Sequence, residues 1–221
     1  MSATLTGIDG YPGGWVAARM HGHHIDWQAC AEEDFGILVA DVTAVDMPIG
    51  LQETGWRECD ERARQLLAKA GSRVFMTPPR SVVELGLSVT NEVVQEESRR
   101  TTGQGVSRQA LGLATRILVV DRYIARHPRA AIREVHPELS FLALAGRVLD
   151  SKKTATGVAQ RLLALGKWRT DIIEALSRAP DGVPIDDCLD ALACLWSAER
   201  IEQGIAEILP TAATKAPRIT Y

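Results

Sequence analysis

The sequence predicts a single α/β domain over residues 1–221, in which helices flank a mixed central sheet. Three observations support this fold class. Short β-prone runs separated by turn residues fill the first forty positions, two apolar runs that end at prolines follow later, and helical periodicity dominates the remainder. A chain of 221 residues also lies within the size range of one hydrophobic core.

The first three strands are predicted over residues 5–8, 15–20 and 25–30. The sequence Tyr11-Pro12-Gly13-Gly14 separates the first two strands, and residues 21–24 separate the second from the third. Because proline and glycine between short β-prone runs form tight turns, these three strands are expected to be antiparallel neighbours.

Two further strands are predicted over residues 42–49 and 130–135, where Pro48 and Pro137 end the apolar runs. Continuous apolar runs of this kind are typical of buried parallel strands. Residues 74–80 are expected to form a loop. The spacing of apolar residues predicts helices over residues 32–40, 57–70, 107–127, 138–145, 156–165, 169–177 and 186–208.

Composition restricts the classes of function. A net charge of −3 argues against coating of nucleic acid by bulk electrostatics, so any contact with nucleic acid is expected to be local. The chain contains no apolar run of membrane-spanning length and begins without a secretory signal pattern, so we expect a cytoplasmic protein without a membrane partner. Four scattered cysteines predict reduced, buried thiols, and the sequence is compatible with a homo-oligomer.

Five acidic residues stand where carboxylates can converge. Asp9, Asp46 and Glu134 lie at the ends of the first, fourth and fifth predicted strands, and Asp187 and Asp190 lie in the first turns of the last helix. Strand ends cluster in an open sheet, and residues three apart share one face of a helix. Clustered carboxylates repel one another, and a divalent cation with oxygen ligands compensates this repulsion. The pattern therefore predicts a Mg²⁺ or Mn²⁺ site.

Each acid also has a structural interpretation. Asp9 and Asp46 are suited to turns before Pro12 and Pro48, and either Asp186 or Asp187 is suited to the N-cap of the last helix. Asp190 differs, because it lies inside an apolar run where an unpaired charge is costly. We therefore expect Asp190 to have a partner.

The chain carries GIDGYPGGW at residues 7–15, VDMPIGL at 45–51 and DDCLDALA at 186–193. These three motifs resemble those of the DUF429 family, whose members are described as predicted nucleases of ribonuclease H-like fold. Further matching positions are Arg57, Cys59, Asp60, Ala63, Arg64, Phe75, Pro79, Arg80 and residues 134–138.

This resemblance implies roles for the acids. Asp9 would be the central metal ligand on the first strand, Asp46 the acid of the fourth strand, and Asp190 the acid of the last helix with Asp187 one turn before it. Glu134 would be an additional ligand. Ribonuclease H proper has a further metal-binding glutamate on its first helix. Glu32 and Glu33 are candidates for this position, although neither aligns with it.

Basic residues outside the predicted strands are candidates for contacts with phosphate oxygens. Charges of this kind are equally typical of a solvated surface. His136 could transfer protons near neutral pH, or it could be a packed residue before Pro137. The basic candidates are Arg57, Arg64, Arg80 and Lys153, together with Lys152 and Arg161.

The sequence favours a Mg²⁺-dependent nuclease or phosphodiesterase of ribonuclease H-like type acting on nucleic acid. One alternative is an actin-like nucleotide-binding protein of the ATPase or kinase type, which would hold a phosphate at the turn Tyr11-Pro12-Gly13-Gly14. Another alternative is a non-catalytic binding protein that keeps the fold and pairs its carboxylates with Arg57, Arg64 or Arg80.

Overall fold

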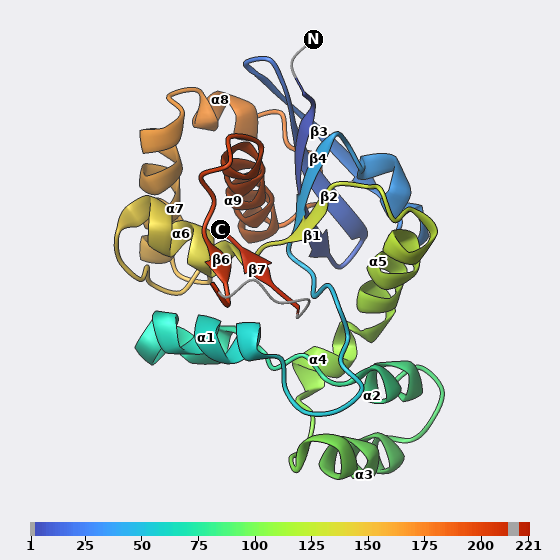
Figure 1. Cartoon of the computed structure of the whole chain (residues 1–221). Coiled ribbons are helices and arrows are strands. Elements are labelled where there is room, and N and C mark those ends of the chain that lie inside the picture. Colours follow the sequence, from blue (N-terminus) through green and yellow to red (C-terminus); the bar gives the residue numbers. More distant parts are fainter. Residues whose placement is uncertain (1–2, 212–216) are drawn as a thin grey trace. The chain divides into compact units, whose positions relative to one another are not determined.

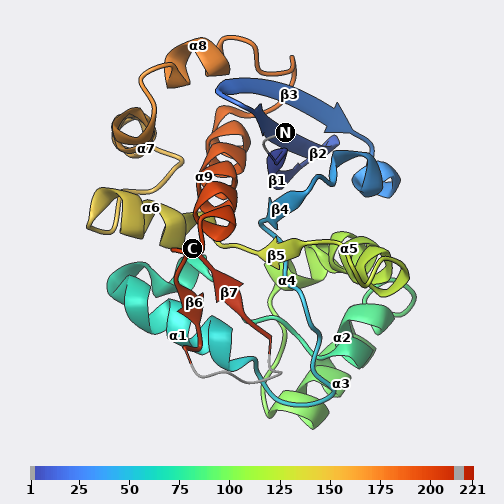
Figure 2. The ribbon, with the colours of Figure 1, turned by 45° about the horizontal axis from the view of Figure 1, so that its top comes forward.

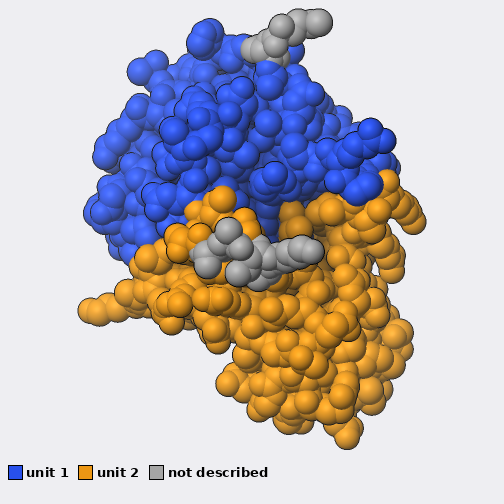
Figure 3. Space-filling model, in the orientation of Figure 1, with its two compact units in different colours: residues 1–47, 127–207, 220–221 blue, residues 48–126, 208–219 orange. Residues whose placement is uncertain are grey.

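The computed structural model describes residues 3–211 and 217–221. Contacts within the chain divide it into two compact units, coloured blue and orange in Figure 3. The first unit contains residues 1–47, 127–207 and 220–221, and the second contains residues 48–126 and 208–219. Each unit has its own hydrophobic cluster. The single domain over residues 1–221 stays a prediction.

A five-stranded mixed sheet in the order β3-β2-β1-β4-β5 forms the centre of the first unit (Figure 1). Strand β2 is antiparallel to β1 and to β3, whereas β4 is parallel to β1 and to β5. This arrangement confirms the predicted α/β class and is consistent with a ribonuclease H-like fold. The strands are β1 (Leu5–Tyr11), β2 (Gly14–His21), β3 (His24–Cys30), β4 (Val42–Val45) and β5 (Ile132–Glu134).

Two-residue turns join the antiparallel strands, as the sequence predicts. Tyr11 pairs with Gly14 at the first turn, and His21 pairs with His24 at the second. The φ angle of Gly14 is +135°, and a Cβ atom at this position would lie 2.1 Å from the carbonyl oxygen of Cys30. Both the backbone conformation and the lack of space therefore require glycine at position 14.

One long helix, α9 (Ile185–Glu202), packs against β1, β2 and β4 and forms the centre of the core (Figure 2). Twelve residues of α9 between Asp186 and Ala198 are buried. The almost continuous apolar sequence of this helix is typical of a helix that is buried on all sides. Helices α6 (Pro137–Ala145) and α7 (Ala155–Trp168) pack against α9. The remaining helices of this unit are η1 (Glu32–Leu38), which is a 3₁₀-helix, and α8 (Ile172–Leu176).

Helix α9 approaches β1 closely because residue 7 is glycine. A Cβ atom on Gly7 would lie 2.0 Å from the backbone nitrogen of Leu195 and 2.3 Å from the carbonyl oxygen of Ala191. Real Cβ atoms do not approach backbone atoms to these distances, so any larger residue would move α9 away from the sheet.

The second unit is mainly helical. Val82, Val94, Val106 and Ala110 form its hydrophobic cluster. Its helices are α1 (Glu58–Leu67), η2 (Ala68–Arg73), α2 (Arg80–Leu85), α3 (Asn91–Thr102), α4 (Arg108–Gly112) and α5 (Ala114–Arg126). Near the end of the chain, the short strands β6 (Ile208–Leu209) and β7 (Ile219–Thr220) form a two-stranded sheet.

Several predicted boundaries were wrong. The helix expected over residues 107–127 is interrupted at Leu113, between α4 and α5. The last helix ends at Glu202 instead of residue 208, because Gly204 with φ +71° ends it before β6 begins. The strand expected over residues 42–49 ends at Val45, ahead of Pro48, which cannot donate to a sheet.

The segment after residue 74 was predicted least well. Arg80 begins α2 instead of belonging to a loop, since Pro79 occupies the N-cap position. Helix α3 was not predicted.

Among residues 3–211 and 217–221, no helix has both the length and the apolar character that a membrane span requires.

Replacement of Gly7 tests the packing of α9 on β1. We expect Gly7→Ala to lower the free energy of unfolding by about 1–3 kcal/mol, because the added methyl group overpacks the core. Urea denaturation measures the change. Gly166→Ala on α7 is the control, since no atom lies within 4 Å of a Cβ atom there, and it should be neutral or stabilising. Equal effects of the two substitutions would contradict the close approach.

Candidate metal centre

Three carboxylates converge in the first unit. Oxygen atoms of Asp9, Asp46 and Asp190 all lie within 4.8 Å of one another. Asp9 is 5% exposed and Asp190 is 3% exposed, and Asp46 is partly buried. The predicted convergence of strand-end acids with the last helix is therefore present for these three residues.

The parallel register of β1 and β4 places Asp9 beside Asp46. Ile8 pairs with Val45, so the next residue on each strand is an aspartate. The backbone N–H of Asp46 donates to the carbonyl oxygen of Ile8 at 2.9 Å, which extends the strand pairing to this point. One carboxylate oxygen of Asp9 also accepts a hydrogen bond from the backbone N–H of Gly10 at 2.7 Å.

Asp190 reaches the same place from helix α9. It precedes Ala191, whose carbonyl oxygen is one of the atoms closest to Gly7 on β1. The absence of a side chain at Gly7 thus brings the helix backbone next to the strand that carries Asp9. Asp9 lies two positions after Gly7 on β1, so the packing contact and the carboxylate cluster have one geometric origin.

Lys152 is the positively charged partner of Asp190. Its ammonium group forms an ion pair and a hydrogen bond with Asp190 Oδ2, and it lies 3.8 Å from Asp186 Oδ2. Burial alone would lower the pKa of Lys152, but the carboxylates of Asp190, Asp9 and Asp46 raise it, so the lysine is charged. The expected partner of Asp190 is therefore a lysine on the loop between α6 and α7.

The three carboxylates destabilise one another in their ionised forms. Burial raises the pKa of Asp9 well above its usual value, and the charges of Asp46 and Asp190 raise it further. Burial and the charge of Asp190 raise the pKa of Asp46 in the same way. Burial raises the pKa of Asp190 to about 6, although Lys152 acts in the opposite direction. Added positive charge in this cluster would stabilise all three ionised groups.

The geometry and the charge of the cluster fit one divalent cation. Three carboxylates and one ammonium group leave an excess of two negative charges when all are ionised. Two oxygens bound to one Mg²⁺ lie at most about 4.2 Å apart, because Mg–O distances are about 2.0–2.1 Å. The oxygens of Asp9, Asp46 and Asp190 already lie within 4.8 Å of one another, so small side-chain movements would complete the arrangement.

Asp187 and Glu134 lie outside this group of three but act on it electrostatically. Asp187 is partly buried in the first turn of α9 and raises the pKa of Asp9. Glu134 is buried at the end of β5 and raises the pKa of Asp46. Their roles as direct ligands remain predictions.

His136 has a structural contact that fits the alternative of a packed residue. Its Nδ1 atom accepts a hydrogen bond from the backbone N–H of Glu138 at 3.3 Å, so its side chain caps α6. Proton transfer by His136 stays a prediction.

Lys153 and Arg161, two of the candidates for phosphate contacts, form ion pairs within the first unit. Lys153 Nζ lies 2.5 Å from Asp186 Oδ2, although its side chain is 73% exposed. Arg161 is fully buried, and its Nη2 atom donates to Glu138 at 2.5 Å. The expectation that Arg161 contacts phosphate is therefore wrong, and its spacing from Val158 and Leu165 on α7 was a signal of burial.

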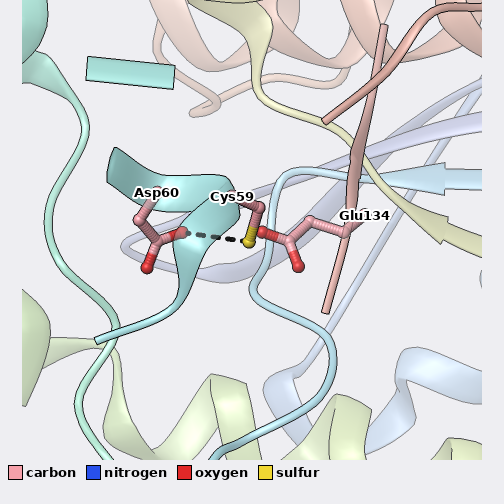
Figure 4. Close-up of side chains that lie close together, drawn as sticks. All are labelled: Cys59, Asp60 and Glu134. Carbon is pink, nitrogen blue, oxygen red and sulfur yellow. Dashed lines mark hydrogen bonds between the residues drawn. The ribbon is translucent and has the colours of Figure 1, made fainter. Parts of the chain in front are cut away.

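The predicted substrate-binding arginines belong to the second unit and have internal partners there. Arg57 is 1% exposed and forms a 2.5 Å ion pair with Asp60, which also accepts a hydrogen bond from the thiol of Cys59 (Figure 4). Arg80 pairs with Asp121 at 2.8 Å. These contacts favour structural roles for Arg57 and Arg80. Binding of substrate by Arg57, Arg64, Arg80 and Lys153 stays a prediction.

Comparison with known proteins gives one match. A family described as "Protein of unknown function (DUF429)" matches residues 7–215, which include every residue of the carboxylate cluster and Lys152. No curated protein and no solved structure matches the chain.

The repulsion within the cluster predicts a pH-dependent effect of Asp46→Asn on the metal-free protein. The folded-state pKa of Asp46 is raised above its usual value of 3.8, so folding favours the protonated acid and wild-type stability is lost as pH rises above this value. The amide does not ionise. Relative to wild type, the variant should therefore become increasingly stable between about pH 4 and pH 7.

Urea denaturation in EDTA at several pH values measures this difference in unfolding free energy. Asp26→Asn is the control, because Asp26 is exposed on β3 and pairs only with exposed groups such as His24. A difference for Asp46→Asn that stays constant or changes in the opposite direction with pH would show that burial and the neighbouring carboxylates do not raise the pKa of Asp46.

Proposed function

We propose that this chain, which belongs to the DUF429 family, is a Mg²⁺- or Mn²⁺-dependent phosphodiesterase of the nuclease type. The observation that carries the proposal is the group formed by Asp9, Asp46 and Asp190, whose negative charge Lys152 balances only in part. Hard oxygen ligands with excess negative charge are the donor set that these two cations prefer.

In this proposal, Asp9, Asp46 and Asp190 hold the cation, and Asp187 contributes negative charge from the preceding turn of α9. A bound divalent cation would lower the pKa of a coordinated water and neutralise charge on a phosphate group. The backbone N–H of Gly10 fixes one oxygen of Asp9, which leaves the other oxygen for coordination.

Lys152 has a second role in the proposal. If Asp190 held a cation, the ammonium group of Lys152 would lose its carboxylate partner, and the lysine side chain, which is 30% exposed, could turn toward solvent. A charged amine next to a metal centre can then donate hydrogen bonds to the oxygens of a phosphate group. The choice of nucleic acid as substrate follows from the resemblance to predicted nucleases, and small phosphodiesters share the same chemistry.

Metal binding and cleavage provide the direct test. We expect saturable binding of Mn²⁺ by electron paramagnetic resonance, and Asp9→Asn and Asp190→Asn should weaken it by at least about tenfold because each removes a ligand. Cleavage of labelled single-stranded, duplex or branched nucleic acid should require the metal and disappear in both variants. Asp26→Asn is the matched control and should retain binding and cleavage. Metal binding without cleavage of any substrate would reject the nuclease activity and leave the metal site supported.

A second candidate function is a non-catalytic binding protein that retains the fold. The ion pair between Lys152 and Asp190 favours it, because this lysine already supplies part of the charge that a metal would supply. In that case the cluster would be a structural ion-pair network. The actin-like alternative stays a prediction, because the Tyr11 ring packs beside Gly13 but Pro12 and Gly13 of the turn proposed for phosphate are exposed.

Lys152→Met distinguishes the two functions. For a metal site, removal of the competing ammonium group should strengthen Mn²⁺ binding by about tenfold or more, because unit charges about 4 Å apart interact strongly in a partly buried site. For a structural network, the variant should be destabilised and millimolar Mn²⁺ should neither bind nor restore its stability. Thermal unfolding with and without Mn²⁺ reports stability, and Lys167→Met on α7 controls for loss of a surface lysine.

A further inference from the structure

A cavity of about 220 Å³ lies within the second unit, lined by residues between positions 56 and 109. Residues from three separate segments meet there: Trp56 before α1, Phe75 after η2, and Gln109 on α4. Neither aspartate nor glutamate is among its lining residues, whereas Arg64 is. The cavity therefore combines one positive charge with aromatic and amide side chains.

Arg64 is held rigidly at the wall of this cavity. Its Nε atom donates to the carbonyl oxygens of Val74 at 2.9 Å and Gly71 at 3.3 Å, which fixes the plane of the guanidinium group. Within the described part of the chain, this arginine forms no ion pair with a carboxylate. The Nη groups of a guanidinium fixed in this way present a fork of donors that matches a phosphate or carboxylate group.

Trp56 contributes its ring to the cavity wall. The residue is partly exposed, and it lines the cavity together with Arg64 and Phe75. Its indole Nε1 atom is buried and has no hydrogen-bond partner among the described residues, so a ligand in the cavity would contact the carbon atoms of the ring and not this nitrogen.

The other lining residues indicate a planar, aromatic ligand. Phe75 and Trp56 contribute aromatic rings to the lining, and stacking of a base on aromatic rings is largely independent of base identity. The amide side chains of Gln104 and Gln109 offer both donors and acceptors, which suit the edge of a base. The volume is smaller than the usual 300–1,000 Å³ or so of sites for drug-sized ligands, so the cavity suits a small ligand and excludes several nucleotides at once.

We propose that this cavity binds a nucleoside monophosphate group, with the phosphate at Arg64 and the base between the aromatic and amide side chains. The group can belong to a free mononucleotide or to one nucleotide of a strand. The proposal goes beyond the metal centre and does not depend on it, because all of its contacts lie in the second unit.

Isothermal titration of the full chain in EDTA tests the proposal without involving the metal site. Adenosine and uridine monophosphate form one arm, short single-stranded oligonucleotides form a second, and inorganic phosphate forms a third. We expect Arg64→Gln to weaken nucleotide binding by at least about tenfold. Arg62→Gln is the matched control, because Arg62 lies on the same helix, is exposed and pairs with Glu58; this variant should bind like wild type.

Gln109→Ala is the second variant, since Gln109 is exposed and its loss should not affect folding. It should weaken binding of nucleotides about two- to tenfold and leave binding of inorganic phosphate unchanged. Binding of oligonucleotides but not mononucleotides, with the same sensitivity to Arg64→Gln, would identify the ligand as part of a strand. The proposal is overturned if neither nucleotide form binds, or if Arg64→Gln and Arg62→Gln have equal effects.

Discussion

The close approach of helix α9 to strand β1 determines the geometry of the first unit. At Gly7 the helix backbone occupies the space that a side chain would need, with Leu195 and Ala191 as the nearest contacts. The same approach brings Asp190 to Asp9, and the parallel register of β1 and β4 adds Asp46. Core packing and the candidate metal centre therefore cannot vary independently, because a displacement of α9 would alter both.

The resulting cluster is electrostatically unfavourable in the metal-free protein. Burial and mutual repulsion raise the pKa values of Asp9, Asp46 and Asp190, and Lys152 offsets only part of the repulsion. A protein stabilised only by its own contacts would gain by exchanging one of these carboxylates for a neutral group. Retention of unfavourable buried charge is typical of functional sites, where a ligand supplies the missing counter-charge.

The sequence alone was sufficient to predict the central sheet and most of the residues of the carboxylate cluster. Turn residues and strand ends are local signals, so the positions of Asp9 and Asp46 followed from them, and the apolar surroundings of Asp190 indicated that it was buried with a partner. The identity of that partner could not be predicted. Lys152 lies in a polar loop 38 residues before Asp190, where nothing in the local sequence distinguishes it from a solvated lysine.

The two units offer different chemistry, and this difference bears on what substrate the protein could select. A cluster of carboxylates with a cation recognises phosphate oxygens and carries little information about the attached base. The cavity at Arg64 has the opposite character, because its aromatic and amide groups contact a base and its single cationic group can hold only one phosphate. The groups of the first unit are therefore suited to reaction at a phosphate, whereas those of the second are suited to recognition of a base, and each can be tested without the other.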